Sequence, residues 1–354
     1  MSVAKSAKEK PTWVKIVKSY QTPDLRISLW QMASSFIPFF LLLTLSYFSI
    51  SISPFLTIPI GILASLFVMR IFIIQHDCGH ASFFKSQKWN NYVGIFCSIF
   101  TLTPYEFWRK SHAIHHAHNG DLNWRGIGDV YTMTVEEYED ASWWGKLKYR
   151  IYRNPYIMFT IGAPFQFVIT HRSLVSIWSA RSDRGRWSLI RTDLVLLAVL
   201  ALAYFTIGID KLLIVYGPVI VFSSIVGVWL FFVQHQYEDA YWSIVPDWDY
   251  KEAALKGSSF MNMNPVMHFF SGYIGYHHIH HLSPKIPNYK LAKCHYDNPD
   301  FQDVPTMTLY DSAGVVFAQL ALWDKKTERL INFKELRRRR AEERKLTANK
   351  VLAS

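Results

Sequence analysis

Residues 54–80 read PFLTIPIGILASLFVMRIFIIQHDCGH. The first 22 of these residues are predominantly apolar, and about 20 helical residues suffice to cross a hydrocarbon core about 30 Å thick. The stretch closes with His76 and His80, which a helix places on one face because they are four positions apart. It therefore predicts a membrane-spanning helix followed by two aligned imidazoles.

The composition also points to a membrane. Half of the 354 residues are apolar and 18% are charged, against roughly 25% charged residues in a typical soluble domain. The formal net charge is +11, and the basic residues lie beside apolar runs instead of forming stripes between folded elements. This placement favours an anionic membrane surface over nucleic acid as the partner.

Four apolar runs have about the length of a membrane span: residues 29–50, 54–75, 192–208 and 212–233. The loops within the two pairs, 51–53 and 209–211, are short enough to force antiparallel turns. Two shorter apolar stretches, 93–104 and 155–170, are expected to be re-entrant or interfacial. We therefore predict an all-α integral membrane protein with four transmembrane helices in two hairpins and a cytoplasmic helical cap that holds the functional site.

Charge predicts the orientation and the division of the chain. The lead segment carries Lys5, Lys8 and Lys10, and the loop 171–191 is rich in arginine, including Arg181. The positive-inside rule places both segments, both termini and the histidine-rich segments in the cytoplasm. We expect a basic cytoplasmic lead at 1–28, a membrane domain at 29–328 and a polar cytoplasmic tail at 329–354.

Histidines at metal-ligand spacing form three short patterns of the type H-x-x-x-H or H-x-x-H-H. Two H-x-x-H-H patterns in one chain should arise by chance in about one chain in several thousand, so the set is a strong signal. The eight histidines are candidate catalytic and metal-binding residues: His76, His80, His112, His115, His116, His277, His280 and His281.

A ninth ligand is expected at His235, which follows the fourth apolar run and should lie level with His80 at the end of the second. The remaining five histidines are expected to be structural, solvated or second to the ligands: His118, His171, His268, His278 and His295. Three carboxylates could orient ligand imidazoles or simply face solvent: Asp77, Glu238 and Asp239.

Neutral imidazole is a ligand for zinc, copper, iron and nickel, and eight or nine imidazoles exceed one tetrahedral site. A pair of metal ions is therefore expected, but the residues alone do not choose among these metals. Glu-x-x-His repeats, the signature of a carboxylate-bridged site in a helix bundle, are missing from the sequence.

The sequence resembles the membrane fatty-acid desaturase superfamily over residues 38–323. The resemblance rests on the three boxes and on four flanking segments: 70–85, 128–129, 229–234 and 272–290. Within the superfamily the chain is most similar to bacterial acyl-lipid desaturases of the delta-5 and delta-12 types, above all the delta-5 type of the bacterial cold response.

The resemblance implies two Fe ions bound by the eight box histidines and His235. It also implies a reaction in which dioxygen is consumed and a cis double bond enters the acyl chains of membrane phospholipids, in the bacterial cytoplasmic membrane. One position departs from the acyl-CoA desaturases: Phe231 stands where those enzymes have an asparagine that binds metal through water. That ligand is not expected here.

Electrons should come from a separate protein, because the sequence has neither an H-P-G-G haem motif nor a ferredoxin-type run of cysteines. We expect a ferredoxin- or flavodoxin-like donor. Two alternatives stay open at this stage. A hydroxylase or ketolase acting on lipid, alkane or carotenoid would use the same residues, and a metal-binding or transport protein would place histidines within its crossing helices, whereas these boxes lie outside the apolar runs.

Overall fold

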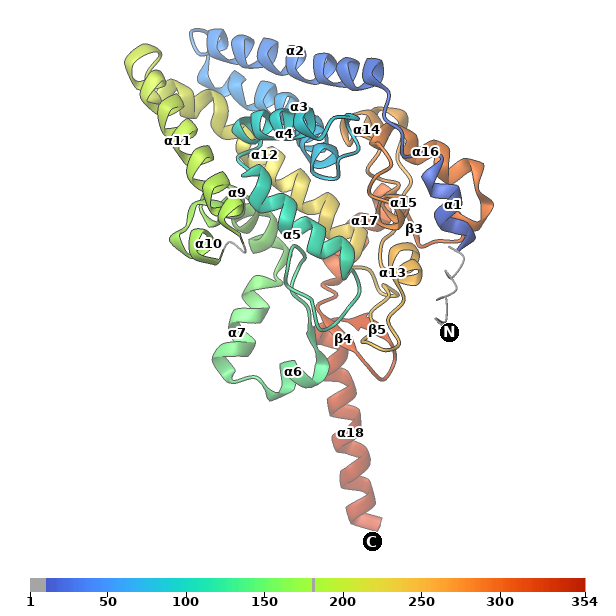
Figure 1. Cartoon of the computed structure of the whole chain (residues 1–354). Coiled ribbons are helices and arrows are strands. Elements are labelled where there is room, and N and C mark those ends of the chain that lie inside the picture. The colour runs from blue at the N-terminus through green and yellow to red at the C-terminus, as the bar shows by residue number, and fades with distance from the viewer. Residues whose placement is uncertain (1–10, 180–181, 354) are drawn as a thin grey trace.

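Helices dominate the computed structural model, which describes residues 11–179 and 182–353 (Figure 1). Four of the basic residues that predict the orientation lie outside the described residues: Lys5, Lys8, Lys10 and Arg181. Four helices are long and apolar enough to cross a membrane: α2 (Leu25–Ser49), α3 (Thr57–Gly79), α11 (Asp183–Thr206) and α12 (Ile209–His235). Figure 1 shows them at one end of the molecule, with α18 (Phe333–Ala353) projecting from the other.

The four long helices form the two predicted hairpins. A turn and the short helix η1 (Pro54–Leu56) join α2 to α3. Gly208 joins α11 to α12 with φ of +89°, a conformation that glycine adopts at little cost. The prediction of four membrane helices in two hairpins is confirmed. All four helices are longer than the predicted apolar runs. The largest difference is in α11, which begins at Asp183 within the predicted loop 171–191, while α3 continues into the first histidine box and α12 includes His235.

Close packing holds α3 against α12. A Cβ atom at Gly61 would lie 2.7 Å from Cβ of Pro218, so the two backbones approach too closely there for any other residue. A second contact follows nearer the other end, where Gly227 faces Met69. Large apolar side chains of the other two long helices are exposed, such as Phe48 of α2 and Phe205 of α11, as a lipid-facing surface requires.

Neither of the two shorter apolar stretches has the length of a span. The first contains α4 (Gln87–Thr101), with 15 residues. The second is broken into short pieces around Gly162 and Pro164: α8 (Pro155–Ile157), η2 (Met158–Gly162), α9 (Ala163–Val168) and η3 (Thr170–Arg172). The element η2 is a single π-type turn, a rare feature that occurs mostly as a bulge within an α-helix.

The remaining elements form a cap over one end of the four long helices. Its helices are α1 (Thr12–Lys18), α5 (Tyr105–Ala117), α6 (Val135–Asp140), α7 (Trp143–Tyr152), α10 (Leu174–Ser179), α13 (Tyr250–Lys256), α14 (Pro265–Phe270), α15 (His277–Leu282), α16 (Asn288–Asp297), η4 (Pro299–Phe301), α17 (Leu309–Ala318) and α18.

Two small sheets tie the cap together. Strand β4 (Leu322–Asp324) pairs in parallel with β1 (Met133–Thr134) and antiparallel with β5 (Arg329–Ile331). The second sheet pairs β2 (Phe260–Met261) in parallel with β3 (Thr306–Met307). The domain boundary that we predict after residue 328 falls between β4 and β5, and the three-part division of the chain stays a prediction.

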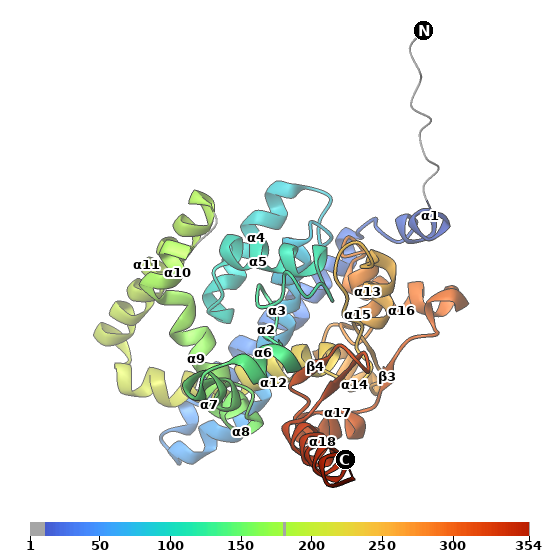
Figure 2. The same cartoon turned by 90° about the horizontal axis from the view of Figure 1, so that it is seen from below.

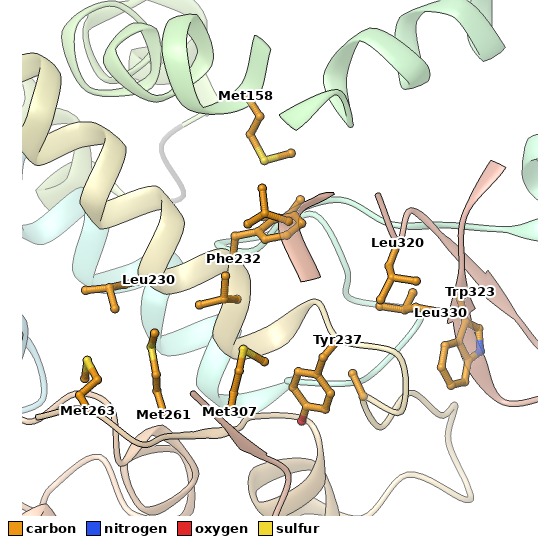
Figure 3. Close-up of a cluster of buried hydrophobic side chains, with 14 of the residues drawn as sticks. Met158, Leu230, Phe232, Tyr237, Met261, Met263, Met307, Leu320, Trp323 and Leu330 are labelled. Carbon is orange, nitrogen blue, oxygen red and sulfur yellow. The ribbon is translucent and has the colours of Figure 1, made fainter. Parts of the chain in front are cut away.

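A methionine-rich cluster joins α12 to the cap (Figure 3). Leu230 and Phe232 of α12 contribute to this cluster, together with buried methionines from several separate segments. The unbranched, polarizable methionine side chain fills irregular spaces between such segments. The labelled methionines are Met158, Met261, Met263 and Met307. Leu230 and Phe232 come shortly before His235 in α12, so the cluster places apolar side chains next to the candidate site.

Candidate metal centre

Nine histidines converge from the ends of four helices. His76 lies in the last turn of α3, with His80 as its C-cap, and His235 is the last residue of α12. The second box lies on α5 and the third on α15. The chain can turn from α4 into α5 because Leu102 adopts a left-handed backbone conformation. The first box is therefore the last turn of a long helix, not a segment outside it.

The first group of imidazoles contains five residues whose ligand atoms all lie within 4.8 Å of one another. His280 is at its centre, because its Nε2 atom lies 2.9 Å from Nε2 of His76 and 2.9 Å from Nε2 of His116. Nε2 of His116 also lies 3.0 Å from Nε2 of His112. His80 completes the group.

The second group lies beside the first. His115, His235 and His281 have ligand atoms within 4.8 Å of one another. Nε2 of His277 lies 2.9 Å from Nε2 of His235 and 3.2 Å from Nε2 of His281, so we count His277 as the fourth member. The rings of His116 and His281 stack with centroids 4.2 Å apart, which brings the two groups into contact.

Each H-x-x-H-H box contributes to both groups. On α5, His112 and His116 face the first group and His115 faces the second. On α15 the division is reversed, since His280 joins the first group while His277 and His281 join the second. Residues i and i+4 lie about 40° apart around a helix and i+3 lies about 60° to the other side. One box can therefore supply two neighbouring metal ions.

The atoms present fit metal ions. Two nitrogens bound to one ion at about 2.1 Å and at right angles are about 3 Å apart, which matches the Nε2 to Nε2 distances of 2.9–3.2 Å. The Nε2 atoms of His80 and His115 are buried without a hydrogen-bond partner among the described residues. A buried nitrogen in that state costs free energy unless a ligand satisfies it.

Burial also keeps these imidazoles in the metal-binding form. Seven of the nine histidines have a pKa well below the usual value near 6.5. The main cause is loss of solvation on burial, and the second is repulsion from neighbouring imidazoles. They are therefore neutral at pH 7, and neutral imidazole is the form that binds metal. The histidines concerned are His80, His112, His115, His116, His277, His280 and His281.

Two hydrogen bonds orient ligand rings. Nδ1 of His76 lies 3.1 Å from Oδ1 of Asp77, whose Oδ2 accepts from the N–H of Asn288 at 2.8 Å. Nδ1 of His235 lies 2.9 Å from the carbonyl oxygen of Gly257. A bond of this kind fixes the tautomer and turns Nε2 toward the metal. The sequence offered no signal for Asn288 or Gly257, because both lie far along the chain from the rings they support.

The other two carboxylates do not orient ligands. Glu238 and Asp239 are exposed, and Glu238 forms an ion pair with Arg329. These two carboxylates therefore face solvent, which is one of the two roles considered for them. Asp77, in contrast, is hydrogen-bonded to the ring of His76 and can orient it.

The five remaining histidines all lie outside both groups. His118 stacks on Trp124, and Nε2 of His278 lies 3.0 Å from Nδ1 of His295. His171 contacts Gln166, and His268 stacks on Tyr273. Their separation from the metal groups agrees with the sequence analysis.

Replacing Asp77 with asparagine is expected to lower metal affinity and activity by about 10- to 100-fold, because the amide is a weaker acceptor for the ring of His76. Metal content after dialysis against a chelator measures the effect. Asp239→Asn, at an exposed carboxylate, is the control and should behave as wild type. Equal metal retention in both variants would show that Asp77 has no orienting role.

The fold and the site define a class: a four-span membrane protein with two adjoining groups of imidazoles at the ends of its helices. The sequence model described as "Fatty acid desaturase" matches residues 53–309. The chain belongs to the fatty acid desaturase family.

Similar proteins agree with this membership. A "Fatty acid desaturase" of Bacillus subtilis (strain 168) is 41% identical over 323 residues, which is 91% of this chain and 90% of the relative. An "sn-1 acyl-lipid omega-3 desaturase (ferredoxin)" of Synechocystis sp. is 29% identical, covering 63% of this chain and 62% of the relative. An "sn-1 oleoyl-lipid 12-desaturase" of the same genus is 26% identical, covering 72% and 71%. The resemblance stated from the sequence is confirmed at the level of the family, and the delta-5 subtype stays a prediction.

Proposed function

We propose that the protein is a dioxygen-dependent acyl-lipid desaturase that introduces a cis double bond into acyl chains of membrane phospholipids at a pair of iron ions. The observation that carries the proposal is the convergence of nine imidazoles into two adjoining groups at the ends of α3 and α12. Family membership supports iron as the metal and an acyl chain as the substrate.

In this proposal each group holds one ion. His76, His80, His112, His116 and His280 would bind the first, and His115, His235, His277 and His281 the second. A methylene group has no proton acidic enough for a side-chain base, and the iron pair with dioxygen supplies the oxidant that removes its hydrogen atoms. Overall, the acyl chain gives up two hydrogens, and two electrons and two protons from outside complete the reduction of dioxygen to two waters.

The protein contributes position and exclusion of water. Ligands at the ends of two membrane-length helices would bring the reaction to the surface where acyl chains meet the cap. The Phe231 ring lies 5.2 Å from the ring of His115 and 5.1 Å from that of His235. It covers the second group with an apolar surface where an asparagine would bring water. The methionine-rich cluster continues this apolar surface away from the ligands.

Electrons would come from a soluble carrier at the cytoplasmic side of a bacterial plasma membrane. The name of one relative contains the word ferredoxin, and a ferredoxin- or flavodoxin-like protein fits the lack of haem and iron–sulfur motifs in this chain.

Fatty-acid profiling of a bacterial host that expresses the protein tests the proposal. The expected product is a monounsaturated acyl chain in the phospholipid fraction, formed only with dioxygen and missing in the ligand variant His280→Ala. A hydroxylated or oxo product in place of the double bond would favour the alternative oxygenase. Metal uptake without dioxygen consumption would favour a transport or storage protein.

Orientation is tested by single-cysteine labelling in a variant without Cys78, Cys97 and Cys294. Exposed probes at Ser51 and Asp210 are expected to react with a membrane-impermeant reagent in intact cells, because these turns lie opposite the cap. The cap probes should react only after lysis. Ser283 in the cap is buried, so the cap probes are placed at the exposed residues Asn123, Asp183 and Lys285. Labelling of Asn123 in intact cells would reverse the proposed orientation.

A further inference from the structure

An open hollow with a volume of about 670 Å³ lies on the outer face of α5. Four of its lining residues, at positions 110, 113, 114 and 117, follow the i, i+3, i+4, i+7 spacing of one helix face. The ligands on α5 lie on the opposite face. The lining residues are Lys110, Ala113, Ile114, Ala117, His118 and Trp124.

The hollow is separated from the metal groups by little more than α5 itself. Ala113 and Ala117 are exposed, and neither has side-chain atoms beyond Cβ, so a partner can approach the helix backbone there. A helix with its side chains is about 10–12 Å across. A redox group seated in the hollow would therefore lie about one helix diameter from the ring nitrogens of His115 and His116.

A stacked aromatic pair forms one side of the hollow. The rings of His118 and Trp124 are 4.0 Å apart and only 8° from parallel. The backbone N–H of His118 donates to the carbonyl oxygens of Ile114 and His115, at 3.1 Å and 3.3 Å. The pair is thus fixed to the segment that carries the ligands. Rigid, partly exposed aromatic residues of this kind are frequent anchors in protein interfaces.

The segments that pack beside α5 are rich in basic residues. The hydrogen bond between Arg109 and Asn91 places α4 alongside α5, and the ion pair between Arg191 and Glu106 places the start of α11 there. In the view from below, α4 and α5 overlap (Figure 2). Residues 82–117 and 182–191 contain seven basic and two acidic residues, and both acidic residues, Glu106 and Asp183, are paired with arginines. The basic residues are Lys85, Lys88, Arg109, Lys110, Arg184, Arg186 and Arg191.

We infer that this hollow and its basic surroundings are the docking surface for the electron donor, a small acidic protein with an iron–sulfur cluster or a flavin. The inference rests on the proposed function and assigns its reductant a place. Each reduced [2Fe–2S] ferredoxin is oxidised by one electron, so two dock in turn for every double bond formed. Opposite charges steer such encounters and make them sensitive to salt.

Binding of a plant-type [2Fe–2S] ferredoxin and of a flavodoxin to the metal-loaded protein in nanodiscs tests the inference without relying on turnover. Lys110→Glu reverses a charge at the hollow, and Ala113→Trp fills it. Each is expected to weaken binding of the carrier by at least about tenfold at low salt, and to raise KM for that carrier while kcat at saturation changes little. Lys110→Arg keeps the positive charge and should bind the carrier as the wild type does. Lys345→Glu, on the distant helix α18, is the charge-matched control and should also leave binding unchanged.

Unchanged binding in both hollow variants, or no binding of either carrier to the wild type, overturns the inference. A lipid surface would give a different result: the variants would change the dependence of activity on phosphatidylglycerol in the nanodisc and leave carrier binding intact, which also overturns it. Failure of the proposed function has its own signature, because the wild type would then bind a carrier but form no double bond.

Discussion

Replacing His235 with alanine is expected to lower desaturation by more than about a hundredfold, which exceeds the usual effect of losing a residue that only supports a ligand. His235 supplies one of the four imidazoles of the second group, and its Nε2 atom lies 2.9 Å from that of His277. Without it the second ion would have an incomplete set of ligands. Fatty-acid profiles of cells with matched amounts of membrane-inserted protein measure the loss.

His171→Ala is the matched control for this prediction. His171 is also buried, with 7% exposure against 5% for His235, but it lies outside both metal groups. The control variant should retain most of its activity. Near-normal activity of His235→Ala would remove His235 from the ligand set, and equal losses in the two variants would point to a general effect on folding.

The two groups should also lose their ions independently. We expect about two iron ions per wild-type chain and about one in His280→Ala, because Nε2 of His280 contacts two other ligands of the first group. About one ion is expected in His235→Ala, and almost none in the double variant. Metal analysis of the purified, detergent-solubilised protein gives these numbers directly.

A spectroscopic comparison adds a control for this stoichiometry. The single ion left in each variant should have a different environment, since five imidazoles form one group and four form the other. Retention of two ions in His280→Ala, or loss of both ions in each single variant, would contradict the division into two groups.

The long helices and the histidine boxes could be predicted from the sequence because both are local patterns. Hydropathy marks the four spans, and the spacing of His112, His115 and His116 marks one helix face. The end of α3 was harder to predict, because His76 and Asp77 lower the mean hydropathy although neither residue ends a helix. The first box was therefore expected after the span, whereas its first residue, His76, lies within α3.

The division of the ligands could not be predicted, because it depends on how four helices cross in space. The helical spacing separates His280 from His277 and His281, but nothing in the third box tells which of the two groups His280 joins. The orienting roles of Asn288 and Gly257 could not be predicted either, because these residues act through backbone groups, which every residue type has. Likewise Glu238 was as plausible as Asp77 until its ion pair with Arg329 was known.

The contact between Gly61 and Pro218 gives the membrane helices a mechanical role. This contact lies 15 residues before His76 and 17 before His235, or about 22 Å and about 25 Å along the two helices at 1.5 Å per residue. At this distance from the contact, a relative rotation of one degree about it would move a ligand by about 0.4 Å. Catalytic groups tolerate about 0.5 Å of misplacement. A change in helix tilt, such as a change in bilayer thickness can cause, would therefore alter the distance between ligands on α3 and α12.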